Sequence, residues 1–244
     1  DLKRRIDWEI ISEYGFNSRI GRTLEKTGSS VAGVERDRLR DTADALCETL
    51  RNEIGILRDL DQKTVSTFLA GLLNQMRSKG ALFHPVLNTY IDNWGGYYLI
   101  NKILWMPNFG RFSRTPVFLT TKRGTRFDPI LSAGALGITW YEDWLRKCLG
   151  PIHPQLIEYR EPIFNLVIKA LLNSGILGER QVKGFPVWGM NAEHLRVTSR
   201  VVQFRCQACS HNVSVAADEE DLWQDNACLR FSCRGRYVRD APAP

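Results

Sequence analysis

Apolar side chains recur every three or four residues in several stretches of the chain, and each such stretch predicts an amphipathic helix. The predicted helices cover residues 2–14, about 39–57, 63–79, 139–150 and 162–174. Gly15, Gly80 and Gly175 follow three of them, and glycine is the residue that most readily ends a helix. Helices are therefore the main predicted elements.

Two parts of the sequence favour strands and loops instead. Residues 94–140 are dense in glycine, proline and aromatic residues, which predicts loops and short strands. The segments ILGERQVKGFPVWGM (176–190) and HLRVTSRVVQFRC (194–206) resemble short strands joined by turns. A helix followed by a hairpin is the order of a winged-helix ending, so we expect an α+β, mostly helical fold with a winged-helix-like part.

Four of the six cysteines form two close pairs near the end of the chain, at Cys206, Cys209, Cys228 and Cys233. Four thiolates at such spacing are the ligand set of a tetrahedral zinc site, and they leave no open position for a water molecule. The pattern predicts a structural zinc ion in a C-terminal zinc ribbon. The alternatives are unrelated buried cysteines and redox chemistry. His211 could replace one ligand, although a surface histidine is the simpler interpretation.

The charge is unevenly distributed, although the net charge of +6 is moderate. Residues 93–127 contain six basic and no acidic residues, interleaved with aromatic ones, and residues 226–239 contain four arginines. Cations bind phosphates and aromatic rings stack on bases, so both stretches are candidate nucleic-acid-binding segments that a folded chain could bring together in one groove. Ordinary core aromatics and solvated basic faces are the alternative. The candidate contacts are Trp105, Arg111, Phe112, Arg114, Lys122, Arg123, Arg126, Arg234 and Arg236.

The sequence excludes several other classes of function. It has no phosphate-binding loop, no zinc-protease motif and no serine-hydrolase motif, so we assign no catalytic residue and do not expect this chain to hydrolyse ATP. Nor does it have an apolar run long enough for a membrane span, and we expect a cytoplasmic location. The acidic run at 218–221 is interpreted as a solvated turn. The chain enters a helical pattern directly at Asp1, which suggests a piece of a larger protein.

Three segments, together with the second cysteine pair, resemble a known group of proteins: RRIDWEIISEYGFNSRIGRTLEKTG (4–28), LLNQMRSKGALFHP (72–85) and VWGMNAEHLRVTSRVVQFRCQACS (187–210). They are similar to the accessory region that follows the two motor domains in large bacterial superfamily-2 DEAD/DEAH-box helicases, including those of Druantia-type anti-phage defence. The resemblance implies a parent protein that translocates on DNA with ATP, the motor domains as partners in cis, and possible defence-system subunits as further partners.

The sequence therefore predicts four parts: a helical domain at 1–92, an aromatic and basic region at 93–150, a winged-helix-like domain at 151–203 and a zinc ribbon at 204–244. The expected function is that of a DNA-engaging accessory module of a helicase. The alternative is a zinc-stabilised scaffold that binds a protein partner and touches no nucleic acid.

Overall fold

The computed structural model describes residues 2–15, 23–96, 116–128 and 138–240. It has the predicted α+β fold, and helices of either kind make up about 48% of the described residues. The α-helices are α1 (Leu2–Gly15), α2 (Arg36–Glu53), α3 (Gln62–Ser78), α4 (Asn88–Asp92), α6 (Trp140–Cys148), α7 (Arg160–Asn173) and α8 (Glu220–Trp223). Short 3-10 helices are η1 (Gly55–Leu57), η2 (Pro85–Leu87), η3 (Pro154–Tyr159), η4 (Ala192–His194) and η5 (Ala217–Glu219). No helix in the described residues is long and apolar enough to cross a membrane.

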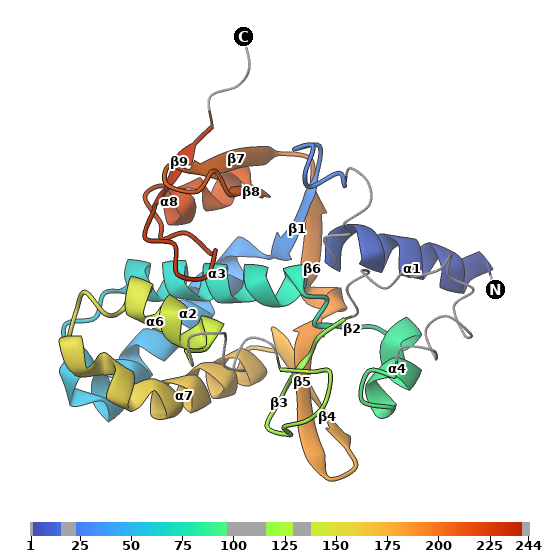
Figure 1. The fold of residues 1–244 in the computed structure, drawn as a ribbon, viewed down its shortest axis with the longest axis horizontal. Coiled ribbons are helices and arrows are strands. Elements are labelled where there is room, and N and C mark those ends of the chain that lie inside the picture. Colours follow the sequence, from blue (N-terminus) through green and yellow to red (C-terminus); the bar gives the residue numbers. More distant parts are fainter. Residues whose placement is uncertain (1, 16–22, 97–115, 129–137, 241–244) are drawn as a thin grey trace.

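Helix α3 runs through the middle of the molecule (Figure 1) and contacts α1, α2, α6, α8 and strand β5. The side chain of Asp61 starts this helix by accepting a hydrogen bond from the backbone N–H of Thr64 at 2.8 Å. At Gly71 the helix meets the indole ring of Trp144, and a Cβ atom there would lie only 2.0 Å from ring atom Cζ2. The indole N–H of Trp144 donates to the carbonyl of Phe68 at 3.0 Å. Glycine at position 71 thus allows α6 to pack directly on α3.

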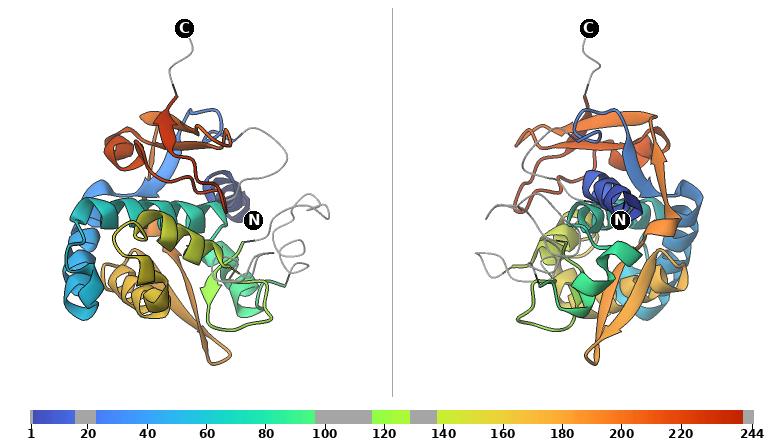
Figure 2. Two further views of the ribbon diagram at one scale, coloured as in Figure 1. Left: turned by 60° about the vertical axis from the view of Figure 1, so that its left-hand side comes forward. Right: turned by 90° about the vertical axis from the view of Figure 1, so that its right-hand side faces the viewer.

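The strands of the described residues form three small sheets. They are β1 (Val31–Val34), β2 (Leu82–Phe83), β3 (Leu119–Thr120), β4 (Leu177–Val182), β5 (Phe185–Asn191), β6 (Leu195–Thr198), β7 (Val201–Cys206), β8 (Asn212–Ala216) and β9 (Tyr237–Arg239). Strand β1 pairs with β6, β5 pairs with β2, β3 and β4, and the C-terminal sheet has the order β8-β7-β9. Figure 2 shows the C-terminal sheet on one side of α3 and the β4–β5 hairpin on the other.

One continuous hydrophobic core connects these elements, and it contains buried residues from all four predicted domain ranges. The division into four domains stays a prediction. The predicted helices at 2–14, 63–79 and 139–150 correspond to α1, α3 and α6. Helix α7 begins two residues before Pro162, which lies in its first turn, where the missing N–H of proline costs nothing. The predicted hairpin corresponds to β4 and β5. These elements do not establish a winged-helix fold.

The acidic run at 218–221 is helical and ion-paired, so the interpretation as a solvated turn was wrong. Three of its carboxylates bind arginines from three different elements: Asp218 with Arg196, Glu220 with Arg239 and Asp221 with Arg36. The fourth residue, Glu219, is buried against β1 and α3 with 9% of its surface exposed. This run therefore fastens the C-terminal sheet to the remainder of the fold.

Burial raises the pKa of the Glu219 carboxyl to about 7, with a further contribution from the negative charge of Asp218. The indole N–H of Trp223 and the guanidinium groups of Arg196 and Arg36 act in the opposite direction but do not offset the burial. The carboxylate form at this position is therefore destabilising.

We expect Glu219→Gln to remove a pH dependence of folding stability. The folded protein binds the Glu219 proton more tightly than the unfolded chain, so wild-type stability falls as the pH rises from about 4.5 to about 7. The variant keeps a neutral side chain throughout. Its stability relative to the wild type should rise over this window, by at most roughly 3 kcal/mol at pH 8.

Urea unfolding at pH 4.5 and pH 8 measures this difference. Glu220→Gln is the matched control, because it makes the same chemical change at a neighbouring carboxylate that is partly exposed. An equal response of the two variants to pH would contradict the assignment to Glu219.

Candidate metal centre

The Sγ atoms of Cys206, Cys209, Cys228 and Cys233 all lie within 4.8 Å of one another. The distance is 3.7 Å between Cys206 and Cys233 and 3.6 Å between Cys209 and Cys228. A disulfide would need about 2.05 Å, whereas four thiolates about 2.3 Å from one tetrahedral ion are about 3.8 Å apart. The four thiols are therefore spaced as ligands of one metal ion.

The turn between β7 and β8 presents the first cysteine pair. Cys206 is the last residue of β7, its carbonyl accepts the N–H of Ser210 at 3.0 Å, and its own N–H donates to the carbonyl of His211 at 2.9 Å. Ser210 has a φ of 55°, in the left-handed region, which closes the turn tightly. Both thiols of the pair therefore face the same side.

Two backbone N–H groups orient the second pair. The N–H of Arg230 donates to Sγ of Cys228 and the N–H of Gly235 donates to Sγ of Cys233, each at 3.4 Å. A Cβ atom at Gly235 would lie 2.5 Å from Sγ of Cys206, so only glycine fits there. Such N–H donors stabilise a negatively charged sulfur, which is the form that binds a metal ion.

Tyr237 lies fully buried beneath the four thiols. Its hydroxyl accepts the N–H of Leu229 at 3.2 Å, lies 2.7 Å from Nδ1 of His211 and lies 3.8 Å from Sγ of Cys228. His211 is thus half-buried, and Tyr237 is its hydrogen-bond partner. It is not one of the four clustered ligands. The contact fixes the imidazole ring against the sheet.

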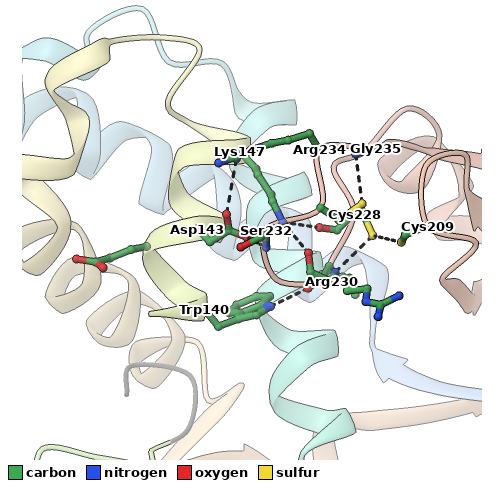
Figure 3. A network of polar contacts seen from close by, with 12 residues as sticks. Trp140, Asp143, Lys147, Cys209, Cys228, Arg230, Ser232, Arg234 and Gly235 are labelled. Carbon is green, nitrogen blue, oxygen red and sulfur yellow. Dashed lines mark hydrogen bonds and ion pairs between the residues drawn. The ribbon is translucent and has the colours of Figure 1, made fainter. Parts of the chain in front are cut away.

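Helix α6 holds the loop that carries the second cysteine pair (Figure 3). The ammonium group of Lys147 lies 2.6 Å from the Asp143 carboxylate and donates to the carbonyls of Cys228 at 3.0 Å and Arg230 at 2.9 Å. The same carboxylate accepts the N–H of Ser232 at 3.0 Å. Only 4% of the Lys147 side chain and 6% of the Asp143 side chain are exposed. A buried ion pair therefore connects the metal loop to the helical body.

Trp140 adds a second attachment one turn earlier on α6. Its indole N–H donates to the carbonyl of Leu229 at 2.8 Å, and its ring stacks on Trp144 with centroids 5.6 Å apart. Trp144 in turn packs on α3 at Gly71. An unbroken line of contacts thus runs from the cysteine loop to the central helix.

The thiols differ in acidity when no ion holds them. Burial alone would raise the pKa of Cys209, but the N–H of His211 and the neighbouring thiols lower it to about 7. Burial raises the pKa of Cys228 to about 12. A coordinated metal ion deprotonates its thiol ligands, so both would be thiolates in a loaded site.

The remaining cysteines lie apart from the cluster. Cys47 is buried in α2, where its thiol donates to the carbonyl of Leu60 at 3.4 Å, and Cys148 is half-buried at the end of α6. Both are free thiols outside the metal-ligand cluster. Within the described residues the four-cysteine group is the one cluster of His, Cys, Asp and Glu with metal-ligand spacing.

The two predicted nucleic-acid-binding stretches do not come together in the described residues. Lys122, Arg123 and Arg126 lie on an exposed loop after β3, whereas Arg234 and Arg236 lie on the metal loop. Figures 1 and 2 place these two loops on opposite sides of α3, so the groove that would join them is not formed by the described residues. Trp105, Arg111, Phe112 and Arg114 lie outside the described residues.

Sequence reasoning missed the residues that support the cysteines. Asp143 and Lys147 are four apart in a predicted helix, which signals an exposed ion pair and not a buried one. Tyr237 could not be distinguished from any other core aromatic. A search against protein-family models, curated proteins and solved structures finds no match to this chain.

We expect one metal ion per chain, bound by the four thiolates. Cys228→Ser should abolish stoichiometric metal in elemental analysis and increase hydrogen exchange across residues 201–239 and in α6, because the metal loop contributes contacts to both. The control is Cys47→Ser, which changes a buried thiol elsewhere and should leave the metal content unchanged. Wild-type protein purified without any bound metal would contradict this expectation.

Lys147→Met should destabilise the metal loop. The change removes the closer cation of the buried Asp143 carboxylate and leaves the largely exposed Arg234 guanidinium at 3.6 Å, so it costs at most about 3 to 5 kcal/mol of folding free energy. It should also lower metal affinity by roughly 10- to 100-fold, because Lys147 orients the backbone that carries a metal ligand and the loss of such orienting contacts weakens metal binding by this amount. Denaturant unfolding and chelator competition measure the two effects.

Arg160→Met provides the control on a neighbouring helix, because Arg160 pairs with Glu142 of α6 at 2.9 Å but is 44% exposed. It should cost less than about 1 kcal/mol and leave metal affinity unchanged. Comparable losses in both variants would argue against a special role for Lys147.

Proposed function

We propose that this chain is a zinc-stabilised nucleic-acid-binding module. The observation that carries the proposal is a group of exposed cations, Lys122, Arg123 and Lys183, around the tip of the β4–β5 hairpin. Two of them are predicted contacts, and Lys183 joins them only through the fold. A cluster of cations on a projecting element suits contact with a phosphate backbone.

The backbone geometry defines this tip. Val182 pairs with Phe185, so Lys183 and Gly184 form a two-residue turn, and their φ values of 46° and 83° are those of a hairpin turn with both residues in the left-handed region. Strand β3 pairs with β5 alongside, with Thr120 opposite Val187. The loop after β3 therefore lies beside the turn, and the ammonium group of Lys122 lies 4.4 Å from the centroid of the Phe185 ring.

Two acids of the surrounding elements, Glu179 and Asp92, have other partners. The carboxylate of Glu179 accepts hydrogen bonds from the indole of Trp188 at 2.9 Å and from Gln181 at 2.7 Å, and Asp92 pairs with Arg180 at 2.8 Å. Phe185 is 36% exposed at the same tip, which leaves an aromatic surface available for contact with sugar or base. The tip thus combines an excess of cations with an aromatic ring.

Zinc is the metal that we propose for the four-cysteine site, because tetrahedral thiolate coordination suits it and leaves no position for a substrate. The ion would then have a structural role and order the arginines of the metal loop. Arg234 lies 3.6 Å from an Asp143 carboxylate that Lys147 already neutralises, and its side chain is 68% exposed. The metal loop is therefore a second basic surface in this proposal.

The resemblance to helicase accessory regions supplies the wider context. In that context α7 with the β4–β5 hairpin would act as a winged-helix element, and the C-terminal sheet as a zinc ribbon, beside motor domains that translocate on DNA, in bacteria as part of anti-phage defence. The alternative is a zinc-stabilised scaffold for a protein partner. It differs from the proposal in one measurable property, since phosphate contacts make affinity depend steeply on salt.

Reversing the charge at the hairpin tip should weaken binding to nucleic acid. We expect Lys122→Glu with Lys183→Glu to lower affinity for a DNA oligonucleotide regardless of its sequence and to reduce the slope of log affinity against log salt by roughly one per lost contact. Fluorescence titrations at several salt concentrations, on single-stranded and duplex DNA, measure both quantities.

Two further variants complete this experiment. Arg58→Glu, directly after η1, reverses an exposed cation elsewhere and controls for net charge, so it should retain most of the affinity. Arg234→Glu reports whether the metal loop takes part. Unchanged affinity in every tip and loop variant, with normal melting curves, would favour the protein-scaffold alternative.

A further inference from the structure

Exposed apolar side chains gather along one face of α1. Seven large apolar side chains of the described residues are exposed, and four of them belong to this face: Leu2 at 75%, Ile6 at 50%, Ile10 at 52% and Leu24 at 46%. The first three are four residues apart, so they share one side of the helix. The backbone N–H of Leu24 donates to the carboxylate of Glu13, so Leu24 lies near the C-terminal end of this helix.

The opposite face of α1 is already used. Trp8, Ile11 and Gly15 are buried, and the helix contacts α3 and η2. Figures 1 and 2 show α1 at the edge of the molecule. The helix is therefore apolar on two faces, and the described residues cover only one of them.

The charges on α1 are arranged against the helix dipole. Lys3, Arg4 and Arg5 occupy the first turn, whereas the acids Asp7, Glu9 and Glu13 follow, and neither an acid in the first turn nor a base in the last turn is present. An isolated helix is more stable with the reverse order, because its N-terminus carries partial positive charge. The pairs Lys3–Asp7 and Arg5–Glu9, at 2.7 and 2.8 Å, offset this only locally.

We infer that the outer face of α1 is a self-association surface that binds α1 of a second copy in antiparallel orientation. A two-fold axis between Ile6 and Ile10 places Ile6 opposite Ile10 of the second copy, and Leu2 opposite its Leu24. The basic half of each helix then faces the acidic half of the other. The helix dipoles of the two copies also point in opposite directions, so the positive end of each helix lies beside the acidic half of the other. This contact offsets the unfavourable order of charges within each helix.

A parallel arrangement lacks this complementarity. It would place the basic first turns of the two helices side by side, and the acidic halves likewise, so that like charges repel. The same side chains therefore favour a second copy of this chain as the partner and the antiparallel orientation of its helix. The interface is small, and it gives a weak dimer that mass action governs.

Sedimentation equilibrium of the full chain tests the inference, at about 1 to 500 µM because an interface of this size has at most micromolar affinity. We expect a dimer to form as concentration rises, and Ile6→Asp with Ile10→Asp to abolish it. The control is Val197→Asp, which changes an apolar side chain of β6 that is 54% exposed, and it should dimerise like the wild type. A wild-type chain that stays monomeric throughout would overturn the inference.

Charge variants and cross-linking test the orientation. Arg5→Glu should weaken the dimer at least tenfold, and Arg5→Glu combined with Glu9→Arg should restore it. Mild oxidation of a mixture of Ile6→Cys and Ile10→Cys chains should give more disulfide-linked dimer than either chain gives alone. The opposite result, in which each variant cross-links best to itself, would overturn the antiparallel arrangement.

Discussion

A buried guanidinium group determines how the N-terminal segment, the central helix and the C-terminal sheet meet. Arg77 lies on α3 with only 2% of its side chain exposed, so its charge must be compensated inside the protein. Glu25 binds it with both carboxylate oxygens, at 2.7 and 2.8 Å, and the carbonyl of Tyr14 accepts a third hydrogen bond. Burial would lower the pKa of this guanidinium, but the Glu25 carboxylate keeps it above its ordinary value. The carbonyl of Glu25 then accepts the hydroxyl of Ser214 at 2.6 Å, which links the same group to β8.

Ion pairs recur where the C-terminal sheet meets the rest of the fold, and the one at α6 is buried. The Asp143–Lys147 pair fastens the metal loop to α6, and the acidic run at 218–221 binds arginines of α2, β6 and β9. A three-stranded sheet of this size has little apolar surface of its own to bury. Its position therefore depends on polar contacts that require both partners, in addition to any metal ion. The four-cysteine cluster is consequently a part of the molecular core and not an appendage to it.

The sequence predicted the parts of the fold that local chemistry decides. The helices α1, α3 and α6 follow from apolar spacing and end residues, and the cysteine cluster follows from paired spacing, because each signal lies within a few residues. The role of the acidic run was misjudged, since its arginine partners are as far as 185 residues away in sequence. Lys183 was missed for the same reason, because only the pairing of β3 with β5 brings it beside Lys122. Contacts between distant segments leave no local pattern from which they can be predicted.

The ion pairs also explain where the positive charge of this protein is available. The excess of 33 basic over 27 acidic residues is small, and Arg36, Arg196 and Arg239 are engaged by the acidic run while Arg77 is engaged by Glu25. Because carboxylates neutralise these arginines, the arginines attract an external anion only weakly. The hairpin tip and the metal loop, by contrast, present exposed cations whose nearby acids are already bound. Under the proposed function, a nucleic acid would either follow the molecule around α3 or engage one of these two basic surfaces at a time. The positive charge that is available to a partner is therefore concentrated on these two loops.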